Sequence, residues 1–290
     1  GDQIVRDMLA DGYTGRKGKG GFYRLNREGG AKIKEARNLV TGEYATANRK
    51  AAFASAKMAK QGITRMLDHD DEGSAFVAEV LLDTLSYAAY LVPEVTDDIY
   101  AIDGAMKVGY NWKKGPFEMI DSIGAAEVVK RLQALGRSVP EFLQTGADKG
   151  SFYSIEDGEI HRLSPSGEMV QVSRPPETLT VADLKRRGKP IQRNASASIW
   201  DAGDEVLLVE YHSKMNAMDP LSMEILLTAV DMAEYGDWKG ILIANDSNNF
   251  CAGANLGLAL FGANLAAWKD VEDFIALGQE SYQALKYAEV

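Results

Sequence analysis

The chain has 290 residues, of which 46% are hydrophobic and 26% are charged, as is typical of globular proteins. Its formal net charge of -10 disfavours nucleic acid and anionic lipid as bulk partners, but leaves room for a local basic pocket that takes a phosphorylated ligand. The single cysteine, Cys251, excludes an intrachain disulfide, and no apolar run approaches the roughly 20 residues that span a bilayer. We expect a cytoplasmic chain with no membrane span and no nucleic acid partner.

The first half of the chain is predicted to be helical. Residues 31–68 are rich in Ala, Lys and Met, and their apolar positions recur at helical spacing. An apolar core helix is predicted over roughly 75–92, with Ser74 as its N-cap and Pro93 at its end. Further helices are expected over 96–109, 117–124 and 125–136.

The character of the sequence changes after residue 150. Residues 151–173 alternate between apolar and polar side chains, and Asp157-Gly158 suits a type I′ turn between two strands. Residues 174–195 are rich in Pro, Arg and Lys, which indicates a linker with a short helix. From Ala197 onward, two strands, an amphipathic helix, a buried strand and a turn into another helix predict an α/β domain.

One short string recurs in the chain. Lys19-Gly20-Gly21-Phe22-Tyr23 is echoed by Lys149-Gly150-Ser151-Phe152-Tyr153. Each copy follows an apolar stretch of helical character and a turn that contains glycine. The echo indicates two tandem units that end alike, of which the first is almost wholly missing from this sequence.

The segment 102–124 carries a family resemblance. It contains Ile102-Asp103-Gly104-Ala105-Met106, then Gly115-Pro116-Phe117-Glu118, then Asp121, and it resembles the C-terminal helical domain of 3-hydroxyacyl-CoA dehydrogenases. The Gly-Lys-Gly-x-Phe-Tyr string at 18–23 belongs to the same pattern, whereas Gly104 and Lys113-Lys114 depart from it. The resemblance implies structural roles for Asp103, Glu118 and Asp121 at helix ends and turns.

A second resemblance lies in the last hundred residues. The strings Lys214-Met215-Asn216-Ala217-Met218 and Asn249-Phe250-Cys251-Ala252-Gly253-Ala254-Asn255-Leu256 resemble the crotonase superfamily, which includes enoyl-CoA hydratases. The resemblance implies that the N–H of Ala254 binds the carbonyl oxygen of a CoA thioester as that oxygen gains negative charge. It also implies that Ala252 and Gly253 line the CoA path and that Lys214 pairs with a CoA phosphate.

Much of either active site is not found in this sequence. The second N–H donor and the hydratase glutamates would follow residue 290, so we expect this chain alone to be inactive as a hydratase. Residues 18–23 match neither the G-x-G-x-x-G fingerprint of NAD-binding proteins nor the P-loop. His69, His161 and His212 are interpreted as bystanders. The acidic run 68–72 is interpreted as solvated helix-capping charge, so no metal site is predicted.

Together the resemblances imply a fragment of a bifunctional β-oxidation enzyme, 3-hydroxyacyl-CoA dehydrogenase followed by enoyl-CoA hydratase, with NAD as cofactor of the parent and acyl-CoA as substrate. The alternatives are a non-catalytic assembly module, or a crotonase-type isomerase or thioester hydrolase. We expect a mostly α-helical dehydrogenase-type part, a β-hairpin and linker, and a partial α/β crotonase-like domain. The expected segments are 1–30, the end of a first helical unit; 31–150, a second helical unit; 151–196, hairpins and linker; and 197–290, the crotonase-like part. An incomplete crotonase sheet would leave a bare edge, which predicts a homo-oligomer in which a neighbouring chain covers that edge.

Overall fold

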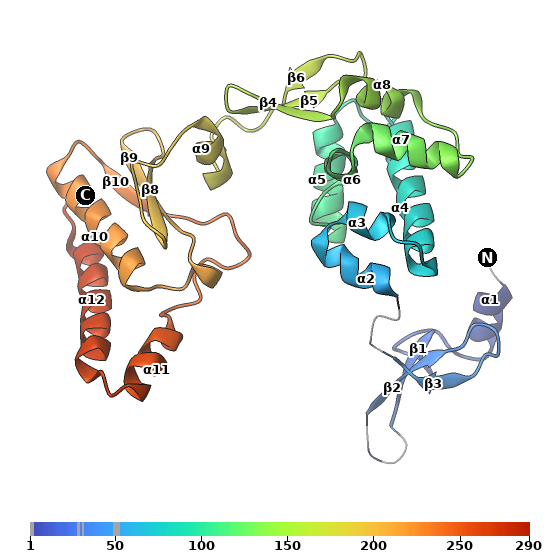
Figure 1. Cartoon of the computed structure of the whole chain (residues 1–290), viewed down its shortest axis with the longest axis horizontal. Helices are drawn as coiled ribbons and strands as arrows, with labels where there is room; N and C mark the ends of the chain where they lie inside the picture. Colours follow the sequence, from blue (N-terminus) through green and yellow to red (C-terminus); the bar gives the residue numbers. More distant parts are fainter. Residues whose placement is uncertain (1–2, 28–29, 31, 49–52) are drawn as a thin grey trace. The chain divides into compact units, whose positions relative to one another are not determined.

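The computed structural model describes residues 3–27, 30, 32–48 and 53–290. The chain divides into two compact units, Gly1–Leu81 and Leu82–Val290 (Figure 1). No helix in the described part of the chain combines the length and the apolar character that crossing a membrane requires.

The first unit opens with a helix and a three-stranded antiparallel sheet. The elements are α1 (Gln3–Ala10), β1 (Tyr23–Asn26), β2 (Ile33–Arg37) and β3 (Tyr44–Thr46), and the strand order is β1-β2-β3. The helical prediction for 32–46 is therefore wrong, and residues 31 and 49–52 of the predicted stretch lie outside the described residues. The physical reason is cross-strand pairing, because the buried Glu35 of β2 accepts hydrogen bonds from Arg24 at 2.6 Å and Asn26 at 2.9 Å, both on β1. This pairing also crosses the expected boundary at residue 30.

The helical prediction is confirmed further along the same unit. The elements there are α2 (Ala54–Met58), the 3₁₀ turn η2 (Ala59–Gln61), α3 (Ile63–Leu67) and the start of α4 (Glu72–Tyr90). Asp71, and not Ser74, caps α4, since its carboxylate accepts the N–H groups of Ser74 at 2.8 Å and Ser55 at 3.0 Å. Burial works against ionisation, but these hydrogen bonds hold the pKa of Asp71 down to about 2. The capping role expected for the acidic run 68–72 is confirmed for Asp71.

The second unit begins with a helical cluster. Its helices after α4 are α5 (Ile99–Tyr110), α6 (Pro116–Ile123), α7 (Ala125–Ala134) and α8 (Glu141–Lys149), which confirms the helices predicted over this stretch. Helix α5 ends at Tyr110, one residue later than predicted, and its C-cap Asn111 takes a left-handed conformation. The rings of Phe117, Phe142 and Phe152 form a tilted and edge-to-face cluster with centroids 5.0 to 6.0 Å apart.

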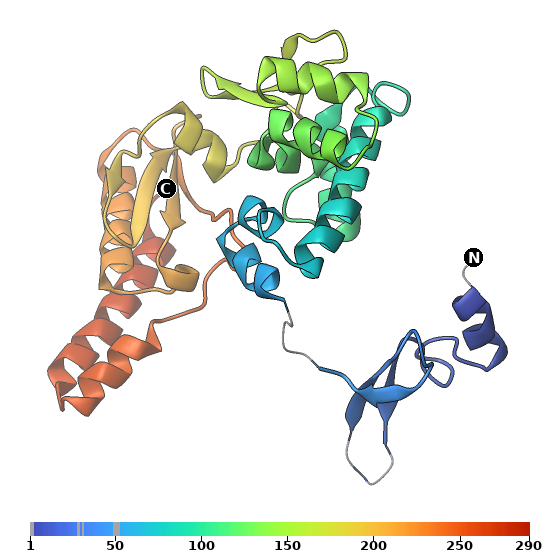
Figure 2. The same ribbon diagram turned by 45° about the vertical axis from the view of Figure 1, so that its right-hand side comes forward.

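A three-stranded antiparallel sheet follows α8 (Figure 2). Its strands are β4 (Tyr153–Glu156), β5 (Glu159–Leu163) and β6 (Met169–Gln171). Asp157 and Gly158 both have positive φ, which confirms the type I′ turn between β4 and β5. The recurring string is therefore part of a larger repeat, because both copies lead from a helix through a glycine turn into a three-stranded sheet. In the second copy Phe152 is fully buried, whereas Phe22 in the first copy is 43% exposed.

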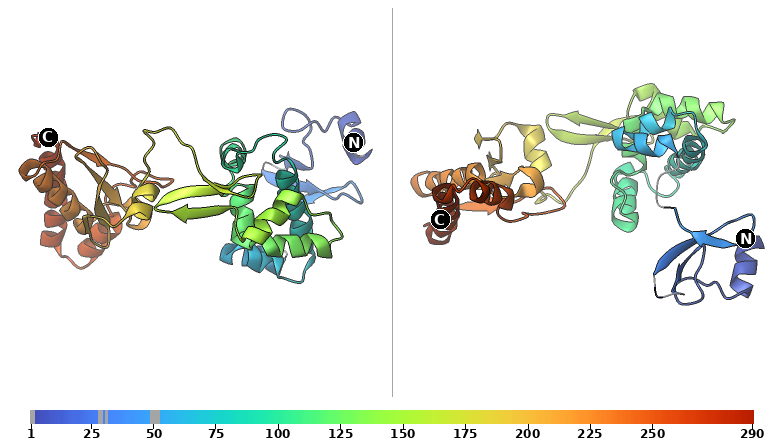
Figure 3. Two further views of the ribbon diagram at one scale, coloured as in Figure 1. Left: turned by 90° about the horizontal axis from the view of Figure 1, so that it is seen from above. Right: turned by 60° about the horizontal axis from the view of Figure 1, so that its bottom comes forward.

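The last part of the second unit is α/β. It contains α9 (Val181–Arg187), β7 (Gln192–Arg193), β8 (Ala197–Asp201), β9 (Val206–Tyr211), η3 (Lys214–Asn216), α10 (Pro220–Tyr235), β10 (Gly240–Ile243), α11 (Leu256–Asn264) and α12 (Trp268–Tyr287). The sheet order is β10-β9-β8-β7, and β10 runs parallel to β9. Helix α10 packs on the sheet, and α12 runs alongside α10 (Figure 3). The predicted order of strands and helices is confirmed.

Candidate functional site

The structure brings together the two segments that the sequence analysis singled out in the α/β part. The segment after β9, residues 214–218, lies against the loop 249–255 after β10. The N–H of Met218 donates to the carbonyl of Gly253 at 2.9 Å, and the N–H of Asn255 donates to the carbonyl of Met218 at 2.8 Å. The N–H of Ala252 donates to the carbonyl of Met215 at 3.3 Å. These bonds hold the loop as a short extension of the sheet.

The side chains of two asparagines hold the loop 249–255 in place through hydrogen bonds. Asn216 is buried, and its amide donates to the carbonyl of Asn249 and to the hydroxyl of Ser247, both at 2.7 Å. Asn245 accepts the N–H of Tyr211 at 2.8 Å and donates to the carbonyl of Phe250 at 2.6 Å. Asn216 and Asn245 therefore both link the end of β9 to the loop that follows β10.

The backbone at Met215 and Asn216 is strained. Their φ values are 60° and 53°, so two consecutive residues with side chains take the left-handed conformation. Such residues cost free energy and persist only where surrounding contacts impose them. Here the imposing contacts are the hydrogen bonds of Asn216, and the kink leads the chain to the point where Met218 meets Ala254.

The geometry leaves the N–H of Ala254 available. Met218 and Ala254 form a parallel bridge in which Met218 bonds to the residues on either side of Ala254, so the N–H of Ala254 itself points away from Met218. Ala254 is exposed, and its N–H has no hydrogen-bond acceptor among the residues that the structure describes. Gly253 precedes it with a φ of +86°, and a Cβ built there would meet no atom within 4 Å. An oxygen atom can therefore approach this amide closely.

A helix begins directly after this amide. Asn255 is the N-cap of α11, and its side chain accepts the N–H of Gly257 at 3.2 Å. The free N–H groups at a helix N-terminus carry partial positive charge, which favours an anionic group nearby. The N–H of Ala254 and the start of α11 therefore favour negative charge at the same place.

Two tyrosines and a methionine pack beside the bridge. The hydroxyl of Tyr282, from α12, donates to the sulfur of Met218 at 2.9 Å. Burial raises the pKa of Tyr211, and burial together with Cys251 raises the pKa of Tyr282, so both phenols stay protonated at neutral pH. These side chains form a wall beside the bridge, and neither phenol is ionised to act as a general base at neutral pH.

The other residues predicted for this site lie on the same segments. Lys214 is exposed at the start of η3 and has no ion pair among the described residues. Ala252 is also exposed, but its N–H is used by Met215, so it cannot act as a second donor to a ligand. Nε2 of His212 lies 2.9 Å from the hydroxyl of Ser198 on β8, which gives this histidine a structural partner. Within the described residues, no group of three or more His, Cys, Asp or Glu side chains could hold a metal ion.

The acidic residues of the helical cluster have the structural roles predicted for them. Asp103 of α5 is buried and accepts the N–H groups of Phe117 at 2.9 Å and Glu118 at 3.0 Å, at the N-terminus of α6. It also accepts the hydroxyl of Tyr153 at 2.9 Å. Burial raises the pKa of Asp103 to about 6 despite these bonds. Asp121 accepts the N–H groups of Phe152 at 2.7 Å and Tyr153 at 2.9 Å, which anchors the start of β4.

Sequence reasoning misses the two asparagines that position the loop. Asn216 stands within the motif that carries the crotonase resemblance, and Asn245 follows the predicted buried strand. Asn216 lies five residues after the end of β9, and Asn245 lies two residues after the end of β10. The supporting role of these asparagines depends on the pairing of β9 with β10, which the sequence pattern does not specify.

Comparisons with known proteins add a second line of observation. The chain is 33% identical over 290 residues to a Bacillus subtilis (strain 168) protein named "Probable 3-hydroxyacyl-CoA dehydrogenase". The matched region includes 98% of this chain and 36% of that protein. Homologues with such names cover nearly the whole chain. Two proteins provisionally named fatty acid oxidation complex trifunctional enzyme, from Rickettsia felis and Rickettsia prowazekii, are 30% and 28% identical over 99% of this chain. The chain spans about a third of the length of these curated relatives, 36% in each case. No family model matches the chain.

Proposed function

We propose that this chain is part of a fatty-acid β-oxidation enzyme and that residues 197–290 bind a CoA thioester through the N–H of Ala254. The observation that carries the proposal is the exposed amide of Ala254, which has no acceptor among the described residues and is held in place by the hydrogen bonds of Met218 to Gly253 and Asn255. The names of the relatives support the same substrate class, because a 3-hydroxyacyl-CoA dehydrogenase acts on an acyl-CoA.

The proposed chemistry follows from where negative charge develops. When a nucleophile adds to an enoyl-CoA, the thioester oxygen gains negative charge, and a preorganised N–H aimed at that oxygen lowers the barrier. The amide of Ala254 needs no rearrangement to do this, since the hydrogen bonds of Gly253 and Asn255 with Met218 already hold it in position. Lys214 would pair with a phosphate of CoA, and Ala252 and Gly253 would line the path of its pantetheine arm.

The N–H of Ala254 would be one of two donors in a complete oxyanion site, and the wall around it provides no general base. We therefore infer that this chain by itself does not hydrate enoyl-CoA. A spectrophotometric assay with crotonyl-CoA tests this inference, and turnover well above the rate without protein would overturn it.

NAD is the oxidant that we propose for the dehydrogenase reaction of the parent enzyme. The glycine-rich segment 18–23 does not fit this cofactor, because it follows a turn and leads into β1, whereas a dinucleotide fingerprint follows a strand and opens a helix. We therefore assign no NAD-binding role to these residues. The repeat of helix, glycine turn and sheet supports two tandem helical dehydrogenase units, with the end of the first unit moved from residue 30 to a point after β3.

The proposal is tested by calorimetric titration of the chain with acetoacetyl-CoA, whose carbonyl groups can accept the amide. Ala254→Pro removes the N–H, and Ala254→Ser keeps it. A charge-assisted hydrogen bond of this kind corresponds to a loss of about ten- to a hundredfold in affinity for the proline variant, with the serine variant close to wild type. Because proline could disturb the loop, replacement of Ala254 by lactic acid, which exchanges only N–H for O, is the second variant. Equal affinity of all four proteins would overturn the proposal.

Assembly is a second candidate function, favoured by the apolar surface of α11. None of its residues is buried, and its exposed large side chains are Leu256, Leu258, Leu260 and Phe261. Contiguous exposed apolar surface marks a contact with further protein. The partner that we propose is a second copy of the chain, covering α11 and the free edge of β10.

A further inference from the structure

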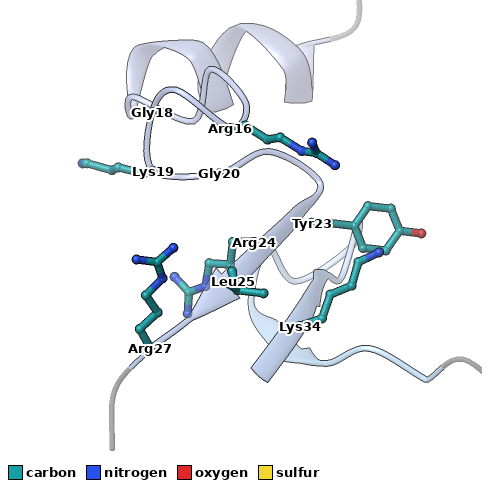
Figure 4. Close-up of a pocket in the computed structure, with 9 residues that line it drawn as sticks. All are labelled: Arg16, Gly18, Lys19, Gly20, Tyr23, Arg24, Leu25, Arg27 and Lys34. Atoms are coloured by element: carbon teal, nitrogen blue, oxygen red, sulfur yellow. The ribbon is translucent and has the colours of Figure 1, made fainter. Parts of the chain in front are cut away.

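A basic pocket lies in the first compact unit, in a part of the chain to which the proposed function assigns no ligand. It is formed by the turn after α1 and by β1 and β2, and its volume is about 810 Å³ (Figure 4). The residues that line it are Arg16, Gly18, Lys19, Gly20, Tyr23, Arg24, Leu25, Arg27 and Lys34. Five of these side chains are positively charged and none is acidic, although the whole chain has a net charge of -10.

Three of the cations are held in place by neighbouring groups. Nε of Arg24 lies 2.6 Å from the carboxylate of Glu35. The ammonium group of Lys19 donates to the carbonyl of Asp11 at 2.9 Å. Nζ of Lys34 lies 4.9 Å from the centre of the Tyr23 ring, a cation–π contact across β1 and β2. Each of these cations keeps further N–H donors, since none of the contacts uses more than one or two.

The other two cations, Arg16 and Arg27, pair with no acidic side chain that the structure describes. Among the residues that the structure describes, the guanidinium groups of Arg16 and Arg27 form no ion pair and no side-chain hydrogen bond. Arg16 comes from the turn and Arg27 from the end of β1, so both sides of the pocket present a free guanidinium (Figure 4). Like charges that lie together without a counterion are unfavourable, and an anion in the pocket would relieve this repulsion.

The turn that carries Arg16 and Lys19 is preformed. The N–H of Gly15 donates to the carbonyl of Gly20 at 2.7 Å, and the N–H of Gly18 donates to the carbonyl of Gly15 at 3.0 Å. A Cβ at Gly18 would lie 2.3 Å from the hydroxyl of Thr14, and one at Gly20 would lie 2.6 Å from Cβ of Arg24. The tight path therefore requires glycine, and it fixes the backbone positions from which Arg16 and Lys19 extend before any ligand binds.

We propose that this pocket binds the diphosphate group of a nucleotide-type ligand. A guanidinium group matches phosphate oxygens with two parallel N–H donors, and two free arginines on opposite sides suit two linked phosphate groups. The volume leaves room for more of the ligand than a single phosphate ion. CoA, dinucleotides and free diphosphate share this chemistry. The pocket is independent of the Ala254 site, so either proposal can fail while the other stands.

The test is calorimetric titration of the full chain with pyrophosphate, CoA and NAD at low and moderate salt. The variant is Arg16→Gln with Arg27→Gln, which removes two exposed guanidinium groups that have no side-chain partner among the described residues. The matched control is Arg6→Gln with Lys17→Gln, which makes the same change in net charge outside the pocket. Losing two charge-assisted contacts should weaken pyrophosphate binding at least about tenfold in the pocket variant, and the control variant should stay within about twofold of wild type.

The outcomes distinguish the sources of the ligand. Tighter binding of CoA than of NAD or pyrophosphate, retained by Ala254→Pro and lost by the arginine variant, supports the pocket as a CoA subsite. Equal binding of all three supports a diphosphate site without further selectivity. Equal weakening in the pocket and control variants, or no binding of pyrophosphate, CoA or NAD, would overturn the proposal.

Discussion

Met218 and Ala254 face each other in a parallel bridge, and every hydrogen bond of that bridge is made by Met218 with a neighbour of Ala254. The bridge thus fixes the position of Ala254 without using its amide. A residue held by its neighbours while its own N–H stays free is what a preorganised hydrogen-bond donor requires.

Asn216 is predicted to be the main support of the bridge. Its Ala variant would lose the bonds to Asn249 and Ser247, which hold the loop against a strained backbone. We expect a loss of about 1–3 kcal/mol in unfolding free energy, measured by urea denaturation, together with weaker acetoacetyl-CoA binding. Lys214→Ala, two residues away and exposed, is the control for stability. An Asn216→Ala protein as stable as that control would contradict the role assigned to Asn216.

The contact between Gly115 and Asp103 gives a prediction about packing. A Cβ at Gly115 would lie 2.3 Å from the backbone and side chain of Asp103, so Gly115→Ala must displace α5 or α6. Gly104 lies in α5, and a Cβ added there would meet no atom within 4 Å, so Gly104→Ala should instead stabilise the helix by about 1 kcal/mol. Thermal denaturation of the two variants should therefore shift in opposite directions. A Gly115→Ala protein that melts at or above the wild-type temperature would contradict the close contact with Asp103.

The buried carboxylate of Asp103 gives a pH dependence. Its pKa is raised from 3.8 to about 6 in the folded protein, so the folded protein binds this proton more tightly than the unfolded chain does. The resulting stability is present below about pH 4 and is lost as pH rises through about 6, by up to about 3 kcal/mol for a shift of this size. Asp121, whose pKa burial also raises, acts in the same direction. Urea denaturation between pH 4 and 7 measures the slope.

Two variants separate Asp103 from the other acids. Asp103→Asn should lower stability at pH 4 and flatten the dependence between pH 4 and 7, because the titrating group is gone. Tyr153→Phe removes one hydrogen bond to Asp103 and should cost about 1 kcal/mol while leaving a titrating group in place. A slope that is unchanged in Asp103→Asn would assign the pH dependence to a different group.

The apolar face of α11 predicts self-association. Leu260 and Phe261 are 63% and 66% exposed, and their replacement by glutamate should shift the chain toward monomer in sedimentation velocity experiments at micromolar concentration. Leu39→Glu, at a residue that is 64% exposed in the first unit, is the control. A wild-type chain that sediments as a monomer at every concentration would exclude this partner.

Much of the fold could be predicted from sequence because local signals agreed with the tertiary contacts. The turn at Asp157-Gly158 and the Pro116 start of α6 are examples, since in each the residue type dictates the backbone conformation. The helical prediction for 32–46 was wrong because there the local preference and the tertiary contacts disagree. Its Ala and Lys content favours helix only weakly, and the pairing of β2 with Arg24 and Asn26 on β1 overrides that preference.

The candidate site could likewise be predicted only in part from the sequence. The motif around Ala254 is visible in the sequence because small residues are needed wherever backbone approaches a ligand. The supporting roles of Asn216 and Asn245 are not visible, since they depend on which strands lie side by side. The basic pocket was equally hidden, because Arg16 and Arg27 come together with Lys34 only through the antiparallel pairing of β1 with β2.

The measurement that tests the central claim most directly is the amide NMR signal of Ala254 during titration with acetoacetyl-CoA. Labelling with ¹³C-carbonyl glycine and ¹⁵N-alanine selects amides that follow a glycine, among them the Gly253-Ala254 peptide. A hydrogen bond to the ligand oxygen should move this proton downfield in a saturable manner, while the Gly124-Ala125 amide in the helical cluster stays in place. If the ligand binds and the Ala254 signal does not move, the amide is not the oxyanion donor and the proposed function is contradicted.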